Sequence, residues 1–259
     1  MNPGCIITNE KSKTCQEACM PEYFDMHCHL LFGVDDGPAC ITEALTLLQQ
    51  EYDDGVRTIY LTPHYRRNMF ECPHEARVQN FELLKTHAKQ RFPELNLKLG
   101  CEIHVSMDLL QDLKSGKCSP LEGTDFILLE FQEAAEKKYI IERCHAAMTG
   151  GYSPIIAHAE RCIAIRRDFR LLQKLSDMGV YIQMNAGSIS GEDGFLRKRF
   201  CKKVMQRNLL HFVGSDAHNP KSRKPNIKKC ARYMKRIMGA DYRDQIMEIN
   251  PREIIEGSV

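Results

Sequence analysis

Short apolar runs rich in β-forming residues alternate with longer stretches of helical periodicity from residue 23 onward. This alternation constrains the fold most, because it is typical of repeated βα units whose parallel strands are covered on both faces. We expect seven strands, at residues 23–29, 57–62, 96–102, 125–130, 154–158, 180–185 and 210–214. We expect helices at residues 42–54, 73–91, 106–115, 136–148, 169–177, 194–207 and 226–238, with a closing helix near residue 251. The length of 259 residues is close to the ~250 typical of one barrel domain, so the pattern predicts an α/β fold, a TIM-like (βα)7 barrel.

The charge balance excludes several classes of partner. The 36 Lys and Arg residues and 34 Asp and Glu residues leave a formal net charge of +2, which provides no broad positive surface for nucleic acid or an anionic membrane. No apolar run reaches the ~18 residues of a membrane span, so we expect no membrane insertion. Residues 1–22 lack the apolar segment of a secretory signal, and we treat them as an N-terminal extension of a domain at 23–259. Twelve cysteines are too few for a disulfide scaffold, so we expect reduced thiols and a cytoplasmic protein.

Two histidines lie at the end of the first expected strand. His27 and His29 are two residues apart, so they point to the same face while Cys28 points away. Two imidazoles can then converge on one ion, although a pair of buried histidines without a ligand has the same spacing. The other strands decide between these alternatives.

Ligand-type side chains follow six of the seven expected strands. Beyond the first pair they are His64, Glu102, Glu130, His158, Asp216 and His218, with Asp35 in a turn after the first strand. The carboxyl ends of barrel strands form one rim, where active sites lie, so we expect these side chains to meet. Burying so many carboxylates and imidazoles is costly unless they bind cations. The set contains no thiol, which favours Mn, Fe or Zn, with Mn our first choice. Nine candidate ligands exceed the needs of one ion, so we expect two to three.

The motifs that carry these residues resemble those of the PHP (polymerase and histidinol phosphatase) superfamily. Within it, the chain is similar to the manganese-dependent protein-tyrosine phosphatases of bacterial capsule and exopolysaccharide synthesis. The resemblance runs from about residue 24 to residue 255 and rests on these segments: DMHCHLLFGVDDG (25–37), TPHY (62–65), GCEI (100–103), FILLEF (126–131), PIIAHAER (154–161), QMNAGS (183–188), FVGSDAHN (212–219) and NPREII (250–255).

The resemblance implies a distorted barrel of seven βα units and a division of the ligands among ions. The first ion would be held by His27, His29, Glu102 and Asp216. Glu102 would bridge to a second ion, held also by Glu130 and His158. A third ion would be held by Asp35, His64 and His218.

Clustered divalent ions suit phosphoester hydrolysis, because they neutralise phosphate oxygens, lower the pKa of a bridging water and align the attacking and leaving oxygens. We therefore hypothesise that a metal-bridging hydroxide attacks phosphorus without a protein nucleophile. Arg161, on the same rim loop as His158, is a candidate clamp for phosphate oxygens, and Arg223 is a second. For each arginine a solvated surface position is the alternative. Asp36 and His218 are both candidates for protonating the leaving phenolate, and the sequence does not choose between them.

The resemblance implies a phosphotyrosine protein substrate, a bacterial tyrosine autokinase of polysaccharide export, and the relatives suggest self-association into a homo-oligomer. Two alternatives stay open at this point. One is a small-molecule phosphoesterase of the same superfamily, acting on histidinol phosphate or a nucleotide. The other is a metal-stabilised binding protein without turnover.

Overall fold

The structure, a computed structural model, describes residues 22–255 and 257. Its strands are β1 (Tyr23–Cys28), β2 (Val56–Leu61), β3 (His64–Tyr65), β4 (Asn96–Leu99), β5 (Glu102–His104), β6 (Phe126–Glu130), β7 (Ser153–Ile156), β8 (Tyr181–Asn185) and β9 (Phe212–Gly214). Its α-helices are α1 (Ile41–Asp53), α2 (His74–Arg91), α3 (Leu109–Lys114), α4 (Lys137–Thr149), α5 (Ile163–Arg167), α6 (Phe169–Asp177), α7 (Ala186–Ser190), α8 (Phe195–Met205), α9 (Ile227–Met238) and α10 (Ala240–Asp244). A 3₁₀ turn spans Ala159–Arg161, and two π-helical turns span Gln245–Ile249 and Pro251–Ile255.

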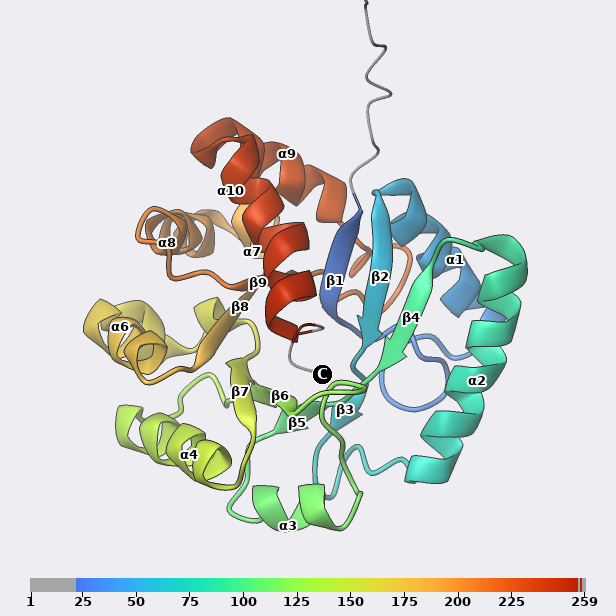
Figure 1. Ribbon diagram of the computed structural model, residues 1–259, viewed down its shortest axis with the longest axis horizontal. Coiled ribbons are helices and arrows are strands. Elements are labelled where there is room, and N and C mark those ends of the chain that lie inside the picture. Colours follow the sequence, from blue (N-terminus) through green and yellow to red (C-terminus); the bar gives the residue numbers. More distant parts are fainter. Residues whose placement is uncertain (1–21, 256, 258–259) are drawn as a thin grey trace, which may run out of the picture.

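The strands form a distorted parallel barrel surrounded by helices (Figure 1). One sheet has the order β1-β2-β4, the other has the order β3-β5-β6-β7-β8-β9, and the neighbouring strands are parallel. The backbone N–H of Asp216 donates to the carbonyl of His27 at 2.8 Å, and that of His29 donates to Ala217 at 2.9 Å. These bonds join the segment after β9 to β1, so the ring of strands closes beside the candidate ligands.

One of the expected strands is broken, which corrects the prediction of a continuous strand at 96–102: it is divided into β4 and β5 at Gly100. The expected strand at 57–62 is found as β2, and a short strand that was not predicted, β3, follows it beyond Pro63, which has no N–H to donate. A Cβ at Gly100 would lie 2.7 Å from Leu121 Cδ2, so the chain passes that side chain too closely for a larger residue. Beyond Pro63 and Gly100, β3 and β5 pair with His64 opposite Glu102. This pairing therefore carries two candidate ligands to adjacent positions.

Apolar side chains pack on both faces of the barrel. Inside it, Phe24, Met26 and Phe212 belong to a buried cluster with side chains from β2, β6 and β7. Outside it, a larger core fills the space between strands and helices. Covering both faces of the strands explains why their sequences alternate so little.

The closing helical segment begins earlier than expected, at α10 rather than near residue 251. In Figure 1 this red segment lies across the middle of the ring of strands. Asn250 donates to the carbonyl of His211 at 3.0 Å, just before β9 begins, and Arg252 lies 3.2 Å from Glu22, just before β1. The segment therefore covers the amino-terminal end of the barrel and leaves the opposite rim open. No helix in the described part of the chain has the length and apolar character that crossing a membrane requires.

Candidate metal centre

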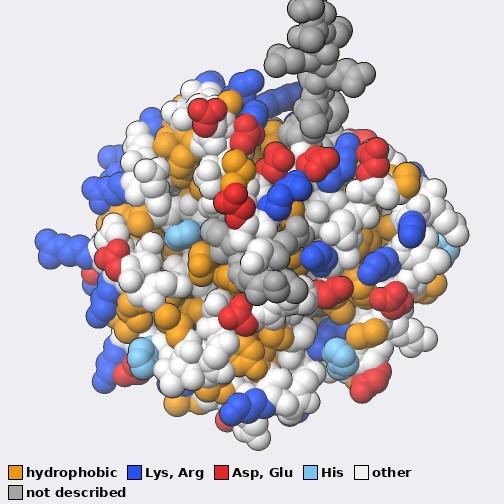
Figure 2. Space-filling view, viewed as in Figure 1, with side chains coloured by type: hydrophobic (Ala, Val, Ile, Leu, Met, Phe, Trp, Pro, Cys, Tyr) orange, Lys and Arg blue, Asp and Glu red, His pale blue; other side chains and the backbone are white. Residues whose placement is uncertain are grey.

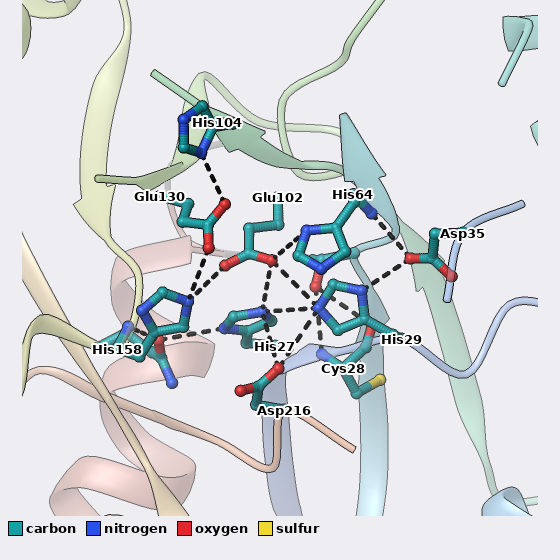
Figure 3. A network of polar contacts seen from close by, with 12 residues as sticks. His27, Cys28, His29, Asp35, His64, Glu102, His104, Glu130, His158 and Asp216 are labelled. Atoms are coloured by element: carbon teal, nitrogen blue, oxygen red, sulfur yellow. Dashed lines mark hydrogen bonds and ion pairs between the residues drawn. The ribbon is translucent and has the colours of Figure 1, made fainter. Parts of the chain in front are cut away.

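The first two candidate ligands converge as the strand alternation predicts. His27 and His29 are fully buried, and their Nε2 atoms lie 3.1 Å apart. The Cys28 side chain points elsewhere, with Sγ 3.5 Å from the carbonyl oxygen of Tyr60. The end of β1 therefore aims two imidazoles, and no thiol, at the rim (Figure 3).

Glu102 lies at the middle of the group and is fully buried (Figure 3). Its Oε2 lies 3.4 Å from His27 Nε2, 3.2 Å from His29 Nε2 and 2.9 Å from His64 Nδ1. Its Oε1 lies 2.8 Å from His158 Nε2. Burial raises the pKa of Glu102, but the surrounding imidazoles outweigh it and hold the pKa well below its usual range. One carboxylate thus touches four imidazoles from three strands, because His27 and His29 both come from the end of β1.

Asp216 connects the histidines to the arginines. Its φ of 53° lies in the left-handed region, and this backbone turns the carboxylate toward His29 Nε2, 3.6 Å from Oδ1. Asp216 Oδ2 lies 2.7 Å from Arg161 Nη2 and accepts from Asn185 Nδ2 at 2.8 Å. Arg223 Nη2 lies 3.1 Å from Oδ1. The structure therefore brings both predicted arginines to the edge of the centre.

The two consecutive aspartates of the turn take different places. Asp35 accepts from His29 Nδ1 at 2.8 Å and from the backbone N–H groups of His64 and Gly37, each at 2.9 Å. Asp36 instead faces the opening, with Oδ1 3.4 Å from His218 Nε2 and 3.6 Å from His64 Nε2. Ligand atoms of His29, Asp36, His64 and His218 all lie within 4.8 Å of one another. Asp36, rather than Asp35, stands with the third group of histidines.

Glu130 borders both Glu102 and a histidine absent from the predicted set. Its Oε1 lies 3.8 Å from His158 Nε2, and its Oε2 accepts from His104 Nδ1 at 2.9 Å. Ligand atoms of His64, Glu102 and Glu130 lie within 4.8 Å of one another. The signal for His104 was available, because it follows Glu102 by two residues on one strand and so shares its face.

The sixth expected strand supplies amides rather than ligands. Gln183 Oε1 accepts from the backbone N–H of His158 at 2.6 Å and lies 3.3 Å from His27 Nδ1. Gln183 Nε2 donates to Asn185 Oδ1 at 3.1 Å, and Asn185 in turn donates to Asp216. Gln183 and Asn185 are two residues apart in β8 and so lie on the same face, and this spacing could have predicted that they orient the ligands.

The residues fit a divalent cation. Glu102 Oε2 and His218 Nε2 are buried without a well-directed hydrogen bond, so each has a lone pair free for another partner. Burial lowers the pKa of His29, but Asp35 and Glu102 outweigh it and raise the pKa to about 10. A proton on His29 thus supplies positive charge that these carboxylates require, and a divalent cation bound at His29 would displace that proton. Imidazole nitrogens and carboxylate oxygens suit Mn, Fe or Zn.

A cavity of about 280 Å³ adjoins the centre. It is lined by Arg161, Asn185, Asp216 and Arg223, together with the residues Glu192, Asp193, Lys224 and Asn226 from neighbouring loops. The two arginines that contact Asp216 therefore also face an open space able to receive an anion.

A distorted parallel barrel whose open rim carries imidazoles and carboxylates is an architecture of the PHP class of proteins. The chain belongs to the capsular polysaccharide synthesis CpsB/CapC family, whose sequence model matches residues 23–256. It is 33% identical over 237 residues to the tyrosine-protein phosphatase CpsB of Streptococcus agalactiae serotype V, covering 90% of this chain and 98% of that protein. It is 32% identical over 218 residues to the tyrosine-protein phosphatase YwqE of Bacillus subtilis, covering 84% of this chain and 85% of that protein.

Solved structures agree with this family. The chain matches a structure from the work on YwqE of Bacillus subtilis and CpsB of Streptococcus pneumoniae, described as metal-dependent tyrosine phosphatases, with a TM-score of 0.79 and 30% identity. That match covers 85% of this chain and 89% of the other. The histidinol phosphate phosphatase of Lactococcus lactis matches with a TM-score of 0.57 at 15% identity over 84% of this chain and 94% of that one, which shows the shared fold alone. The predicted barrel of the PHP type is thus confirmed.

Proposed function

We propose that this protein is a metal-dependent protein-tyrosine phosphatase. The observation that carries the proposal is the group of imidazoles and carboxylates around Glu102, which borders a cavity faced by Arg161 and Arg223. Cations and arginines together suit an ester that carries two negative charges. The family adds the substrate class, because its curated relatives CpsB and YwqE are tyrosine-protein phosphatases.

We propose that the centre holds two to three divalent ions, Mn in preference to Fe or Zn. The first is held by His27, His29, Glu102 and Asp216, the second by Glu102, Glu130 and His158, and the third by Asp36, His64 and His218. This assignment replaces Asp35 by Asp36 in the third group. The geometry supports the replacement, because both Asp35 oxygens already accept hydrogen bonds, one of them from His29 Nδ1. Metal-bound histidines commonly donate their second N–H to such a carboxylate.

We propose that Asp36 and His218 act as ligands and not as proton donors. The His218 ring lowers the pKa of Asp36 well below its usual range. Burial, followed by the charge of His29, lowers the pKa of His218. At neutral pH both groups are therefore unprotonated, which is the form that binds metal.

Divalent ions held by these ligands would supply positive charge for the phosphate oxygens and would lower the pKa of a bound water. Arg161 binds a phosphoryl oxygen from the cavity side while its contact with Asp216 holds the guanidinium in place. Arg223, whose side chain is 40% exposed, closes the other side of the cavity and contacts both Asp36 and Asp216. Gln183 and Asn185 hold the rings and carboxylates in the orientation that the ions require.

Phosphate release tests the proposal. Metal-stripped protein is supplied with Mn, Fe or Zn and assayed on a phosphotyrosine peptide and on histidinol phosphate. We expect metal-dependent turnover of the peptide that is lost in H29A and R161A but kept in the control variants H87A and R91A, which alter exposed residues of α2. Preference for histidinol phosphate would replace the substrate by a small ester. Hydrolysis of neither compound by loaded protein would favour a binding protein without turnover.

We further propose that the natural substrate is the phosphorylated tyrosine segment of a bacterial tyrosine autokinase. The description of the family as one of capsular polysaccharide synthesis supports a role in that process. The cytoplasmic location, the homo-oligomer and the boundary of the extension at residues 1–22 stay predictions from the sequence. Of that extension, residues 1–21 lie outside the described part.

A further inference from the structure

Two adjacent apolar side chains stand out from the surface at the start of α8. Phe195 is 74% exposed and Leu196 is 78% exposed, the highest values among the large hydrophobic residues described. They follow Gly194, whose φ of 103° turns the chain into the helix. Single exposed apolar residues are ordinary, but a neighbouring aromatic and aliphatic pair forms an exposed apolar patch, which an apolar partner would bury.

The same helix is strongly basic. Residues 195–207 contain six Lys and Arg residues and no Asp or Glu. Lys198 is engaged with its own fold, because it donates to the Ser190 carbonyl at 2.9 Å and lies 4.4 Å from the Tyr233 ring centre. Arg199 and Lys203 are exposed and form no ion pair with any described residue. These two cations project from α8 one turn apart, on the same face.

Helix α6 extends this basic surface. Its first residue, Phe169, packs against Phe200 of α8 with ring centres 6.3 Å apart, so the two helices lie side by side. Arg170 and Lys174 of α6 are exposed. Figure 2 shows Lys and Arg side chains gathered along the edge of the molecule where Figure 1 places α6 and α8. We call Phe195, Leu196, Arg199, Lys203, Arg170 and Lys174 the α6–α8 surface.

Two carboxylates that precede α6 and α8 in the sequence are paired with other cations. Asp168 lies 2.6 Å from Lys137 Nζ, and Glu192 lies 2.6 Å from Lys229 Nζ. The formal charge of +2 for the whole chain therefore conceals a local excess of positive charge. Electrostatic attraction depends on this local excess, because it decays within about 10 Å at 0.1 M salt.

We propose that the α6–α8 surface docks the protein on a membrane that contains anionic phospholipids. Phe195 and Leu196 enter the boundary between headgroups and acyl chains, and the four cations lie against the headgroups. Exposed Phe and Leu beside clustered Lys and Arg are the composition of surfaces that bind at such an interface. An acidic polypeptide or a nucleic acid complements the cations but provides no apolar phase for both Phe195 and Leu196.

This docking also orients the catalytic side of the barrel. The loop that leads into Phe195 contains Glu192 and Asp193, which line the cavity beside Arg161. A protein held through Phe195 therefore has the cavity close to the lipid surface, where it meets substrates that are attached to the membrane. The docking itself does not depend on the proposed hydrolysis.

Sedimentation with vesicles tests the proposal on the full-length chain. The vesicles contain phosphatidylcholine alone or with about one third phosphatidylglycerol, at low and high salt. We expect binding to the anionic vesicles that weakens at high salt. F195S/L196S should weaken it at least about tenfold, because both apolar side chains lose their burial. R199Q/K203Q should weaken it about 25-fold, about fivefold for each cation.

Matched controls lie on α2, on another side of the barrel. L83S removes an apolar side chain that is 46% exposed, and K89Q/R91Q removes two cations from the last turn of the helix. Both controls should bind vesicles like the unchanged protein, and all variants should keep their circular dichroism spectrum. The proposal is overturned if the unchanged protein does not bind anionic vesicles at low salt, or if F195S/L196S binds as tightly. If the protein binds polyglutamate, and R199Q/K203Q loses this binding while F195S/L196S keeps it, the surface binds an acidic polypeptide instead.

Discussion

Substituting Asp35 by Asn should weaken metal binding without removing a metal ligand. Asp35 Oδ2 accepts from His29 Nδ1 at 2.8 Å, and both side chains are fully buried. The carboxylate also accepts from two backbone N–H groups. An amide has one acceptor oxygen and a donor NH2, so at least one of these three N–H groups loses its acceptor in D35N.

The magnitude follows from the hydrogen bond that is lost or weakened. A hydrogen bond to a charged group is worth about 1.5–3 kcal/mol, and about 1.4 kcal/mol corresponds to a tenfold change in an equilibrium constant. We therefore expect D35N to lower Mn²⁺ affinity about 10- to 100-fold, the range seen when a carboxylate that orients a metal ligand is removed. D36N should instead lower the number of ions bound at saturation, because Asp36 supplies an oxygen to the third group.

Isothermal titration of metal-stripped protein with Mn²⁺ separates the two effects, since it reports both affinity and stoichiometry. The unchanged protein and D35N should bind the same number of equivalents, with D35N the weaker. If D35N loses an equivalent while D36N keeps them all, Asp35 is the ligand and the assignment proposed above is wrong.

Three further substitutions or treatments give distinct outcomes. Burial and the neighbouring Asp25 raise the pKa of Glu51 well above 4.5, so above that pH the folded state keeps a proton that the unfolded state releases. The free energy of unfolding should therefore fall as pH rises from about 4.5. Urea unfolding between pH 5 and 9 should show this fall for the unchanged protein and a smaller one for E51Q. R161A should lower kcat/KM on a phosphotyrosine peptide about 100-fold or more with unchanged Mn content, and a fall of less than twofold would contradict a clamp. Removing the metal with a chelator should lower the Tm measured by calorimetry. Mn²⁺ added at about 100 times its Kd should restore about 2.7 kcal/mol of the free energy of unfolding for each site. An unchanged Tm would refute a role of the metal in stability.

Much of the candidate centre was predictable because parallel strands end at one rim. His27, His29 and His158 each lie at or just after a strand end, and a parallel barrel brings such positions together whatever the loops do. Glu102 reaches the same rim as the first residue of β5. The break at Gly100 and the short strand β3 after Pro63 were not predicted. The break depends on how closely the chain at Gly100 passes Leu121, a contact between residues that no local pattern connects.

The roles of Asp35 and Asp36 show where a linear pattern fails. The two residues are adjacent and of one type, so their order in the sequence carries no information about which one faces the opening. The turn decides, since a Cβ at Gly37 would collide with the carbonyl oxygen of His29 and the chain folds tightly there. That tight turn places the carboxylate of Asp35 behind His29 and leaves Asp36 toward His218.

The sequence by itself determined the kind of fold and the chemistry of its rim. Alternating β and helical segments require parallel strands, and parallel strands place the residues after them at one end, so residue type at those positions predicts a metal centre. Only the tertiary structure decided which atoms meet. The pairing of His64 with Glu102, the support of Glu130 by His104, and the joining of α6 with α8 into one basic surface depend on register and packing between distant segments. Those relations arise from three-dimensional contact, which neither composition nor spacing along the chain records.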